Sequence, residues 1–247
     1  MKFFKVYSIT AMMFCLSMFL TNAKAQQMET INNSLSVKQK SIITISSLTA
    51  KGDLVKLKTE LNTGLESGLT VSEIKEILVH LYAYCGFPRS IRGLQTFMEV
   101  LNERKAKGIT DHTGREASPV QQDTGKYLRG KKILNELTKT PQPGQLSGYS
   151  AFAPVIDTFL KEHLFADIFE RDVLTFAQRE LVTISVIATI GHAEPMLQSH
   201  LGISLNVGIT SEQLQEFARI IKSTAGKKES KTAQAILDSV LKGRASQ

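Results

Sequence analysis

The second half of the chain carries a glutamate and two histidines that are candidates for acid–base chemistry. Steps of four residues lead from Glu180 to His192, which predicts that both lie on one face of a helix, about three turns apart. His192 follows Gly191 at a predicted helix break, where it either orients a substrate carboxylate or is a solvated loop residue. His200 can act as a general acid or base, since imidazole titrates near neutral pH. The spacing of the two histidines is not a specific metal motif, and we predict no metal site.

Arginine and tyrosine side chains are candidates for binding an anionic substrate, because a guanidinium forms a two-pronged pair with a carboxylate. Tyr84 and Arg89 belong to one run, Tyr84-Cys-Gly-Phe-Pro-Arg89, which either contacts substrate or forms a packed helix break. Arg171 and Arg179 offer a similar carboxylate site, although Arg179 can equally pair with a surface acid. The other histidines, His80, His112 and His163, have no supporting constellation of residues.

The first 25 residues are typical of a secretory signal peptide. Lys2 and Lys5 precede a mostly apolar run, and Ala23-Lys24-Ala25 offers a small-x-small cleavage site. The run is short for a membrane anchor, and no later segment is apolar enough to span a bilayer. We therefore expect an exported protein, periplasmic or secreted, with no membrane attachment after cleavage. Cleavage removes Cys15 and leaves Cys85 alone, as either a buried, inert thiol or a reactive one.

The composition excludes several classes of protein. The chain has 247 residues, of which 42% are hydrophobic and 21% are charged, as in an ordinary globular protein rather than a disordered one. The net charge of +7 falls to +4 when the three lysines of the leader are removed. That balance is mild, and no basic run is interleaved with aromatic residues, so we predict no nucleic-acid partner.

Two copies of one helical unit must position these residues. Leu35, Gln39 and Thr44-Ile45-Ser46 recur 139 residues later as Leu174, Gln178 and Thr183-Ile184-Ser185. A hydroxyl followed three residues later by Gln or Glu, the pattern of a helix N-cap, occurs at four matched places. These capping pairs are Ser36/Gln39, Thr175/Gln178, Thr70/Glu73 and Thr210/Gln213. Apolar residues at i, i+3, i+4 and i+7 follow two of them, and no stretch shows strand alternation, so we predict an all-α fold.

The repeat divides the chain into four parts: a signal peptide (1–25), a first unit (34–104), a connecting segment (105–159) and a second unit (160–243). Pro88 is expected to start a helix after the Gly86 break. In and beyond the connection, helices are predicted over 127–137 and 154–169. A connection of this length inside a compact chain is usually functional or packs over a site.

These motifs resemble the carboxymuconolactone decarboxylase family, whose wider superfamily includes the alkyl hydroperoxidase D-type peroxidases. The resemblance covers roughly 34–103 and 160–225. It is carried by Arg179-Glu-Leu-Val-Thr-Ile184, Gly191-His192, His200-Leu201, Asn206-Val-Gly-Ile-Thr210 and, in the first unit, Gly68-Leu-Thr70 and Tyr84-Cys-Gly-Phe-Pro88. The family resemblance implies an all-α fold that commonly forms trimers or hexamers, and no cofactor.

The resemblance implies two chemistries: decarboxylation of a small lactone acid, or peroxide reduction by a Cys-x-x-Cys pair with a relay glutamate and histidine. The peroxide-reducing chemistry does not fit this sequence, which has no Cys-x-x-Cys pair. The equivalent place in the second unit reads His192-Ala-Glu-Pro195. The resemblance makes His200 our first candidate, as the residue that faces the pocket, and places Glu180 where the peroxidases have their relay glutamate.

The resulting hypothesis is a lyase that acts on a small carboxylate or lactone, with His200 as proton donor and Glu180 setting its protonation. Substrate contacts are expected from His192, Arg179, Arg171, Tyr84 and Arg89. Two alternatives stay open: a thiol-dependent peroxidase or redox protein that uses Cys85, and a noncatalytic scaffold that binds a small ligand. Fold alone does not choose among them.

Overall fold

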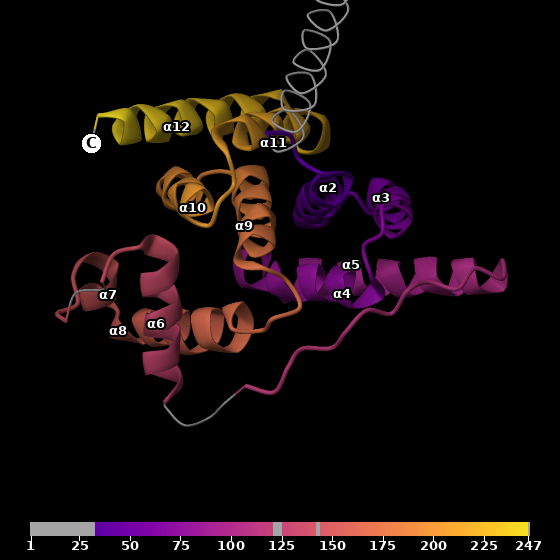
Figure 1. Cartoon of the computed structure of the whole chain (residues 1–247), viewed down its shortest axis with the longest axis horizontal. Helices are drawn as coiled ribbons and strands as arrows, with labels where there is room; N and C mark the ends of the chain where they lie inside the picture. The colour runs from indigo at the N-terminus through magenta and orange to yellow at the C-terminus, as the bar shows by residue number, and fades with distance from the viewer. Residues whose placement is uncertain (1–32, 121–124, 142–143, 247) are drawn as a thin grey trace, which may run out of the picture. The chain divides into compact units, whose positions relative to one another are not determined.

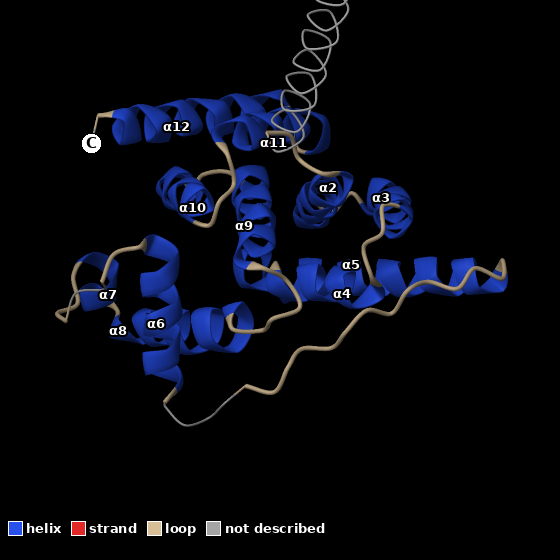
Figure 2. Ribbon diagram, in the orientation of Figure 1, coloured by secondary structure: helices blue, strands red, loops and turns tan. Residues whose placement is uncertain are grey.

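Helices make up all the regular structure in the part of the chain that the computed structural model describes, residues 33–120, 125–141 and 144–246 (Figure 2). The all-α prediction is confirmed. The predicted signal peptide lies outside the described residues, and all contacts given below lie within the unit that begins at Ser36. None of the described helices has the length and apolar character needed to cross a membrane.

The internal repeat appears as two matched sets of four helices. The first set is α2 (Val37–Lys51), α3 (Leu54–Glu66), α4 (Val71–His80) and α5 (Tyr82–Ala106). The second is α9 (Phe176–Ile190), α10 (Glu194–Asn206), α11 (Ser211–Thr224) and α12 (Lys227–Ala245). All four predicted capping boxes are present, because each hydroxyl accepts from the N3 amide while the N3 side chain accepts from the cap amide.

The two copies share a core to which each contributes helices. Helices α2 and α9 pack against each other, α11 lies on α2, and α4 lies on α9 (Figure 1). Their buried faces are aliphatic: Ile42, Ile43 and Ile45 from α2 meet the corresponding face of α9, which includes Leu181, Val182 and Ile184. Each fully buried side chain of this kind contributes about 1.5–3 kcal/mol relative to exposure. The two copies therefore share one core and belong to the one compact unit that begins at Ser36.

Two helix breaks decide where the candidate residues lie. Helix α5 is interrupted at Gly86, whose φ of +81° and ψ of 163° are not helical, and a second helical stretch that contains Pro88 follows this predicted break. Helix α9 ends at Ile190, and Gly191 and His192 follow with φ of +66° and +57°. His192 therefore lies outside the helix, and the predicted common face of Glu180 and His192 is wrong. Counting in steps of four from Glu180 assumes one continuous helix, but the helix ends before Gly191.

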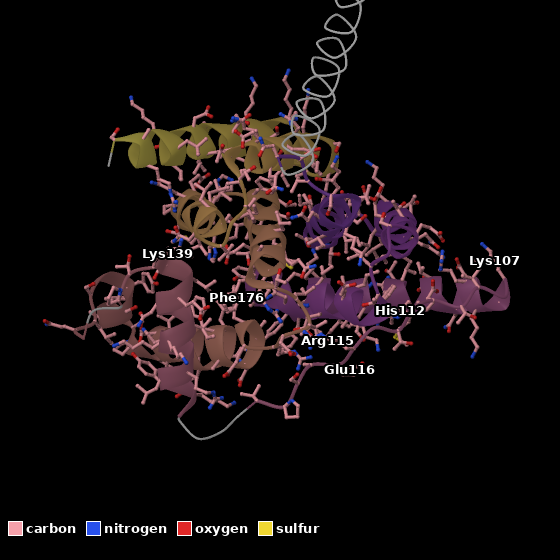
Figure 3. The ribbon with its side chains drawn as sticks, viewed as in Figure 1. Lys107, His112, Arg115, Glu116, Lys139 and Phe176 are labelled. Atoms are coloured by element: carbon pink, nitrogen blue, oxygen red, sulfur yellow. The ribbon has the colours of Figure 1, made fainter. Side chains whose placement is uncertain are left out.

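The connection between the copies has an extended part and a helical part. Residues 109–120 run extended beside the start of α4, whose Val71 and Ser72 amides donate to the carbonyls of His112 and Thr113. Figure 3 labels His112, Arg115 and Glu116 along this segment. The helical part comprises α6 (Lys126–Thr138), α7 (Gly148–Phe152) and α8 (Pro154–Thr158), and the π-helix η1 (Phe159–Phe169), which falls in the predicted second unit, completes the segment before α9. Helices near 127–137 and 154–169 are thus confirmed, with α8 continuing directly into η1.

Candidate active site

A cavity of about 620 Å³ lies between the second copy and the helical connection. One wall comes from α9 and α10, the opposite wall from α6, α7, α8 and η1, and part of the remainder from α5. Most of the lining is apolar, including Leu134, Leu164, Ile187 and Ile203. A mostly apolar cavity with a few convergent polar groups is the usual form of a small-molecule site.

His200 lines this cavity, and the fully buried Glu180 lies behind it as its partner. His200 Nδ1 lies 2.9 Å from Glu180 Oε2, and the carboxylate belongs to a side chain that is 0% exposed. A carboxylate oxygen accepts, so Nδ1 carries the proton and donates, which leaves Nε2 for the cavity. The contact forms because α10 packs back against α9 after the Gly191 break, which brings together two residues 20 positions apart.

Two buried polar atoms beside this pair lack hydrogen bonds within the described residues: Glu180 Oε1 and the Tyr84 hydroxyl. Burial, followed by the charge of Glu180, raises the pKa of Tyr84 well above its ordinary value, so this phenol is a neutral donor. The Tyr84 ring also lies edge-on to His200, with centroids 6.0 Å apart. Unsatisfied buried groups are rare in folded proteins, and here they adjoin a cavity that a ligand or water can fill.

A second polar group lines the cavity from the connection. Lys161 and Asp157 form an ion pair on η1 and α8 with side chains 8% and 7% exposed. The Tyr127 hydroxyl donates to Asp157 Oδ2 at 2.7 Å. An ammonium has three donors, so Asp157 does not use them all, and Lys161 Nζ also lies 5.2 Å from the centroid of the Tyr127 ring. Helix α6 reaches Lys161 because residue 130 is glycine; a Cβ there would lie 1.7 Å from the Lys161 carbonyl oxygen.

The sequence pattern does not mark Lys161 and Asp157 as site residues. Their i, i+4 spacing is visible in the chain, but an acid–base pair at that spacing is typical of an exposed helix face. Only the packing of α6 against η1 buries the pair and turns it toward a cavity. The predicted connection (105–159) does pack over the cavity, through Leu134, Thr138, Tyr149, Ser150 and Asp157, whereas Lys161 lies in the predicted second unit.

Arg179 and Arg171 take a structural role in place of the predicted substrate contact. Both bind Glu76: Arg171 through Nε and Nη2 at 2.9–3.1 Å, and Arg179 through Nη2 at 2.8 Å. Arg179 is 0% exposed, and neither guanidinium lines the cavity. Arg179 Nη1 also donates to His80 Nδ1 at 3.1 Å. The arginines are therefore already occupied by a buried carboxylate.

His80 extends this buried network toward Tyr84, although the sequence offered no partner for it. Since arginine only donates, His80 Nδ1 accepts and Nε2 donates to Thr183 Oγ1 at 2.9 Å. Burial and the charge of Arg179 hold the pKa of His80 well below its ordinary value, so the ring is neutral. Its centroid lies 5.6 Å from that of Tyr84. The network thus supports one wall of the site.

The other predicted site residues lie outside the cavity lining. His192 borders a separate hollow of about 10 Å³, too small for more than a water molecule. Arg89 packs over Gly52, against which its guanidinium lies. The Cys85 thiol donates to the Leu81 carbonyl, and burial raises its pKa to about 11. Among the described residues, no three His, Cys, Asp or Glu side chains gather as they would around a metal ion.

The fold and cavity define a class: an all-helical protein with two copies of one unit and a buried carboxylate–imidazole pair in the second. A family model agrees with this class. The carboxymuconolactone decarboxylase family matches residues 16–97 and 154–238, and the chain belongs to that family in a tandem two-unit form. The first match begins within the predicted leader. No match was found among curated proteins.

Proposed function

We propose that this chain is an exported, cofactor-free lyase that removes CO₂ from a small carboxylate or lactone acid in the cavity of the second copy. The observation that carries the proposal is the Glu180–His200 pair, buried at one side of a 620 Å³ cavity with the Tyr84 hydroxyl unpaired beside it. Family membership supports a decarboxylase-like protein but does not give the substrate.

In the proposed reaction, the bond between the substrate and its carboxylate breaks and CO₂ leaves. The electron pair stays on the carbon that carried the carboxylate, delocalised as an enolate. His200 in its doubly protonated form then gives its Nε2 proton to that carbon, while Nδ1 stays bonded to Glu180. A proton from the solvent then reprotonates His200, so that each turnover consumes one proton and releases one CO₂. Proton transfer by a positioned side chain contributes on the order of 10²–10⁴ in rate.

Lys161 and Tyr84 bind the rest of the substrate in this proposal. A tight ion pair would hold back the carboxylate that leaves, because its negative charge must move onto the adjacent carbon. We therefore assign Lys161 to a second carboxylate or to a lactone oxygen, and Tyr84 to the oxygen on which enolate charge develops. Such a substrate carries at least two oxygen-containing groups. One contacts Lys161, and the other contacts Tyr84 beside His200, in an otherwise apolar cavity.

The experiment is a panel of small lactone acids, 3-oxo acids and dicarboxylic acids labelled with ¹³C in the carboxyl group, with release of labelled CO₂ followed by NMR. Against an active substrate, His200→Gln should lower kcat by on the order of 10²–10⁴. The matched control is His163→Gln, a half-exposed histidine outside the cavity lining, which should leave kcat unchanged. Equal rates in wild type and His200→Gln would contradict the role of His200.

The redox alternative rests on Cys85, whose pKa is raised to about 11 by burial and whose thiol lies outside the cavity lining. A thiol of this kind is protonated at neutral pH and is a poor nucleophile. Export and a homo-oligomeric state, trimer or hexamer, belong to the same proposal; gel filtration with light scattering and localisation of the tagged full chain test them.

A further inference from the structure

The first copy has a cavity of its own, about 410 Å³ in volume. It is formed by α2 and α3 of the first copy with α11 of the second. The active-site cavity is formed in the same way, by α9 and α10 of the second copy with residues from the start of α5 in the first. The lining of the second cavity consists of Lys40, Thr44, Leu48, Lys56, Thr59, Glu60, Ile220, Ser223 and Thr224.

The two cavities correspond residue by residue through the internal repeat. Six lining residues of the smaller cavity, shifted by 139 or 140 positions, give six lining residues of the larger one. The pairs are Leu48 with Ile187, Lys56 with Met196, Thr59 with Ser199, Glu60 with His200, Ser223 with Ala83, and Thr224 with Tyr84. The smaller cavity is therefore the same site of the fold in its first copy, rather than an incidental surface hollow.

The acid–base pair is absent from this copy. Ser41 stands at the position of Glu180 and is buried, with its hydroxyl donating to Ser67 Oγ at 3.3 Å. Glu60 stands at the position of His200, and its half-buried carboxylate makes no hydrogen bond or ion pair within the described residues. Partial burial raises the pKa of Glu60. The first copy thus lacks the imidazole that the proposed proton transfer uses, but it keeps a cavity with an unpaired carboxylate.

The remaining polar groups of the cavity mostly present acceptors. Thr44 Oγ1 donates to the Lys40 carbonyl at 2.9 Å, and Ser223 Oγ donates to the Ile220 carbonyl at 2.8 Å. Thr224 Oγ1 donates to the same carbonyl at 3.2 Å and accepts from Ser47 Oγ at 2.8 Å. A hydroxyl whose hydrogen is used still offers lone pairs. The two ammonium groups face their own carboxylates: Lys40 lies 2.8 Å from Glu216, and the exposed Lys56 lies 3.7 Å from Asp53.

We propose that this cavity is a second ligand site and that it binds a small primary alkylammonium ion. The ammonium lies against Glu60 and the hydroxyl oxygens of Thr44 and Thr59, and the alkyl group covers Leu48 and Ile220. An ammonium supplies three donors and one positive charge to a cavity that has spare acceptors and one unpaired negative charge. The site is independent of the proposed lyase reaction, because it contains neither His200 nor Glu180.

The test uses n-butylammonium as the probe and butyrate as an anion of similar size for comparison. Isothermal titration calorimetry and NMR measure the binding of each to the purified full chain. We expect saturable binding of n-butylammonium, weakened at least tenfold by Glu60→Gln and several-fold by Thr44→Val. The matched control is Glu99→Gln, an exposed glutamate outside the cavity, which should not change the Kd.

Lys56→Met separates this proposal from an anion site, since removal of a nearby positive charge should leave n-butylammonium binding unchanged or tighter. The proposal is overturned if n-butylammonium does not saturate, if Glu60→Gln binds it as wild type does, or if Lys56→Met weakens it as much as Glu60→Gln. Butyrate binding that depends on Lys56 would assign the cavity to anions. None of these outcomes bears on the lyase proposal, which is tested by His200→Gln.

Discussion

Glu76→Gln should destabilise the protein far more than Glu216→Gln, although the repeat places the two glutamates at equivalent positions. Shifted by 139 or 140 residues, the pair Lys40–Glu216 of one copy becomes Arg179–Glu76 of the other. The two pairs differ in burial: the Arg179 and Glu76 side chains are 0% and 3% exposed, whereas those of Lys40 and Glu216 are 43% and 19% exposed.

The expected magnitudes follow from that burial. Removing the charge of Glu76 leaves the fully buried Arg179 without an anionic partner and also frees Arg171, and breaking a buried pair in this way costs about 3–5 kcal/mol. Exposed pairs contribute about 0.2–1 kcal/mol, and Lys40 keeps access to water in Glu216→Gln. The expected difference in the free energy of unfolding is therefore at least about 2 kcal/mol.

Urea unfolding followed by circular dichroism at pH 7 measures both variants, at low and at high salt. Added salt should shrink the effect of Glu216→Gln, because exposed charges are screened, and should leave that of Glu76→Gln nearly unchanged. A loss below about 1 kcal/mol in Glu76→Gln, or equal losses in the two variants, would refute the assignment of Glu76 as the counter-ion of a buried arginine network.

Three further predictions concern Gly130, Cys85 and His80. Gly130→Ala should lower the free energy of unfolding by about 1–3 kcal/mol and weaken carboxylate binding, because its Cβ would collide with the Lys161 carbonyl. The control is Gly243→Ala in α12, which has no atom within 4 Å of the added Cβ and should lose no stability. Equal urea midpoints for the two variants would contradict the close packing of α6 on η1. The alkylation rate of Cys85 by iodoacetamide should rise with pH towards a midpoint near its pKa of about 11; a midpoint near pH 8 would revive the redox alternative. Because the pKa of His80 is lowered from 6.5 in the folded state, the unfolded chain gains a proton first as pH falls below 6.5. Stability should then fall by about 1.4 kcal/mol per pH unit for this group, and His80→Gln, but not His112→Gln, should remove that part of the slope in urea titrations at pH 5–7.

Local signals predicted the helices well because their causes are local. A capping hydroxyl and its N3 partner lie within one turn, so Ser36, Thr70, Thr175 and Thr210 could each be identified without knowledge of the packing. The repeat reinforced each instance with a second one. The error at His192 has the same origin, since a periodic count does not register the left-handed backbone that ends α9 at Gly191.

The site depended on tertiary packing, which the sequence conveys only in part. Glu180 and His200 were both named from the sequence, but their 2.9 Å contact depends on how α10 returns against α9. In the sequence, Lys161 looks like an ordinary surface lysine. It lines the cavity only because α6 packs over it. The pairing of Arg179 with Glu76 could have been suspected from the repeat, which places opposite charges at 179 and 76 as at 40 and 216, but the repeat gives no sign of its burial.

The central claim is that a small carboxylate binds beside His200 and Glu180, held by Lys161. The most direct measurement is NMR of the protein labelled with ¹⁵N in its histidine rings, titrated with glutarate and adipate, with signals assigned through His200→Gln. We predict saturable shifts of the His200 ring signals that are absent from His112 and His163 and are lost in Lys161→Met. Dicarboxylates that leave His200 unmoved, or that move it equally in Lys161→Met, would contradict the account.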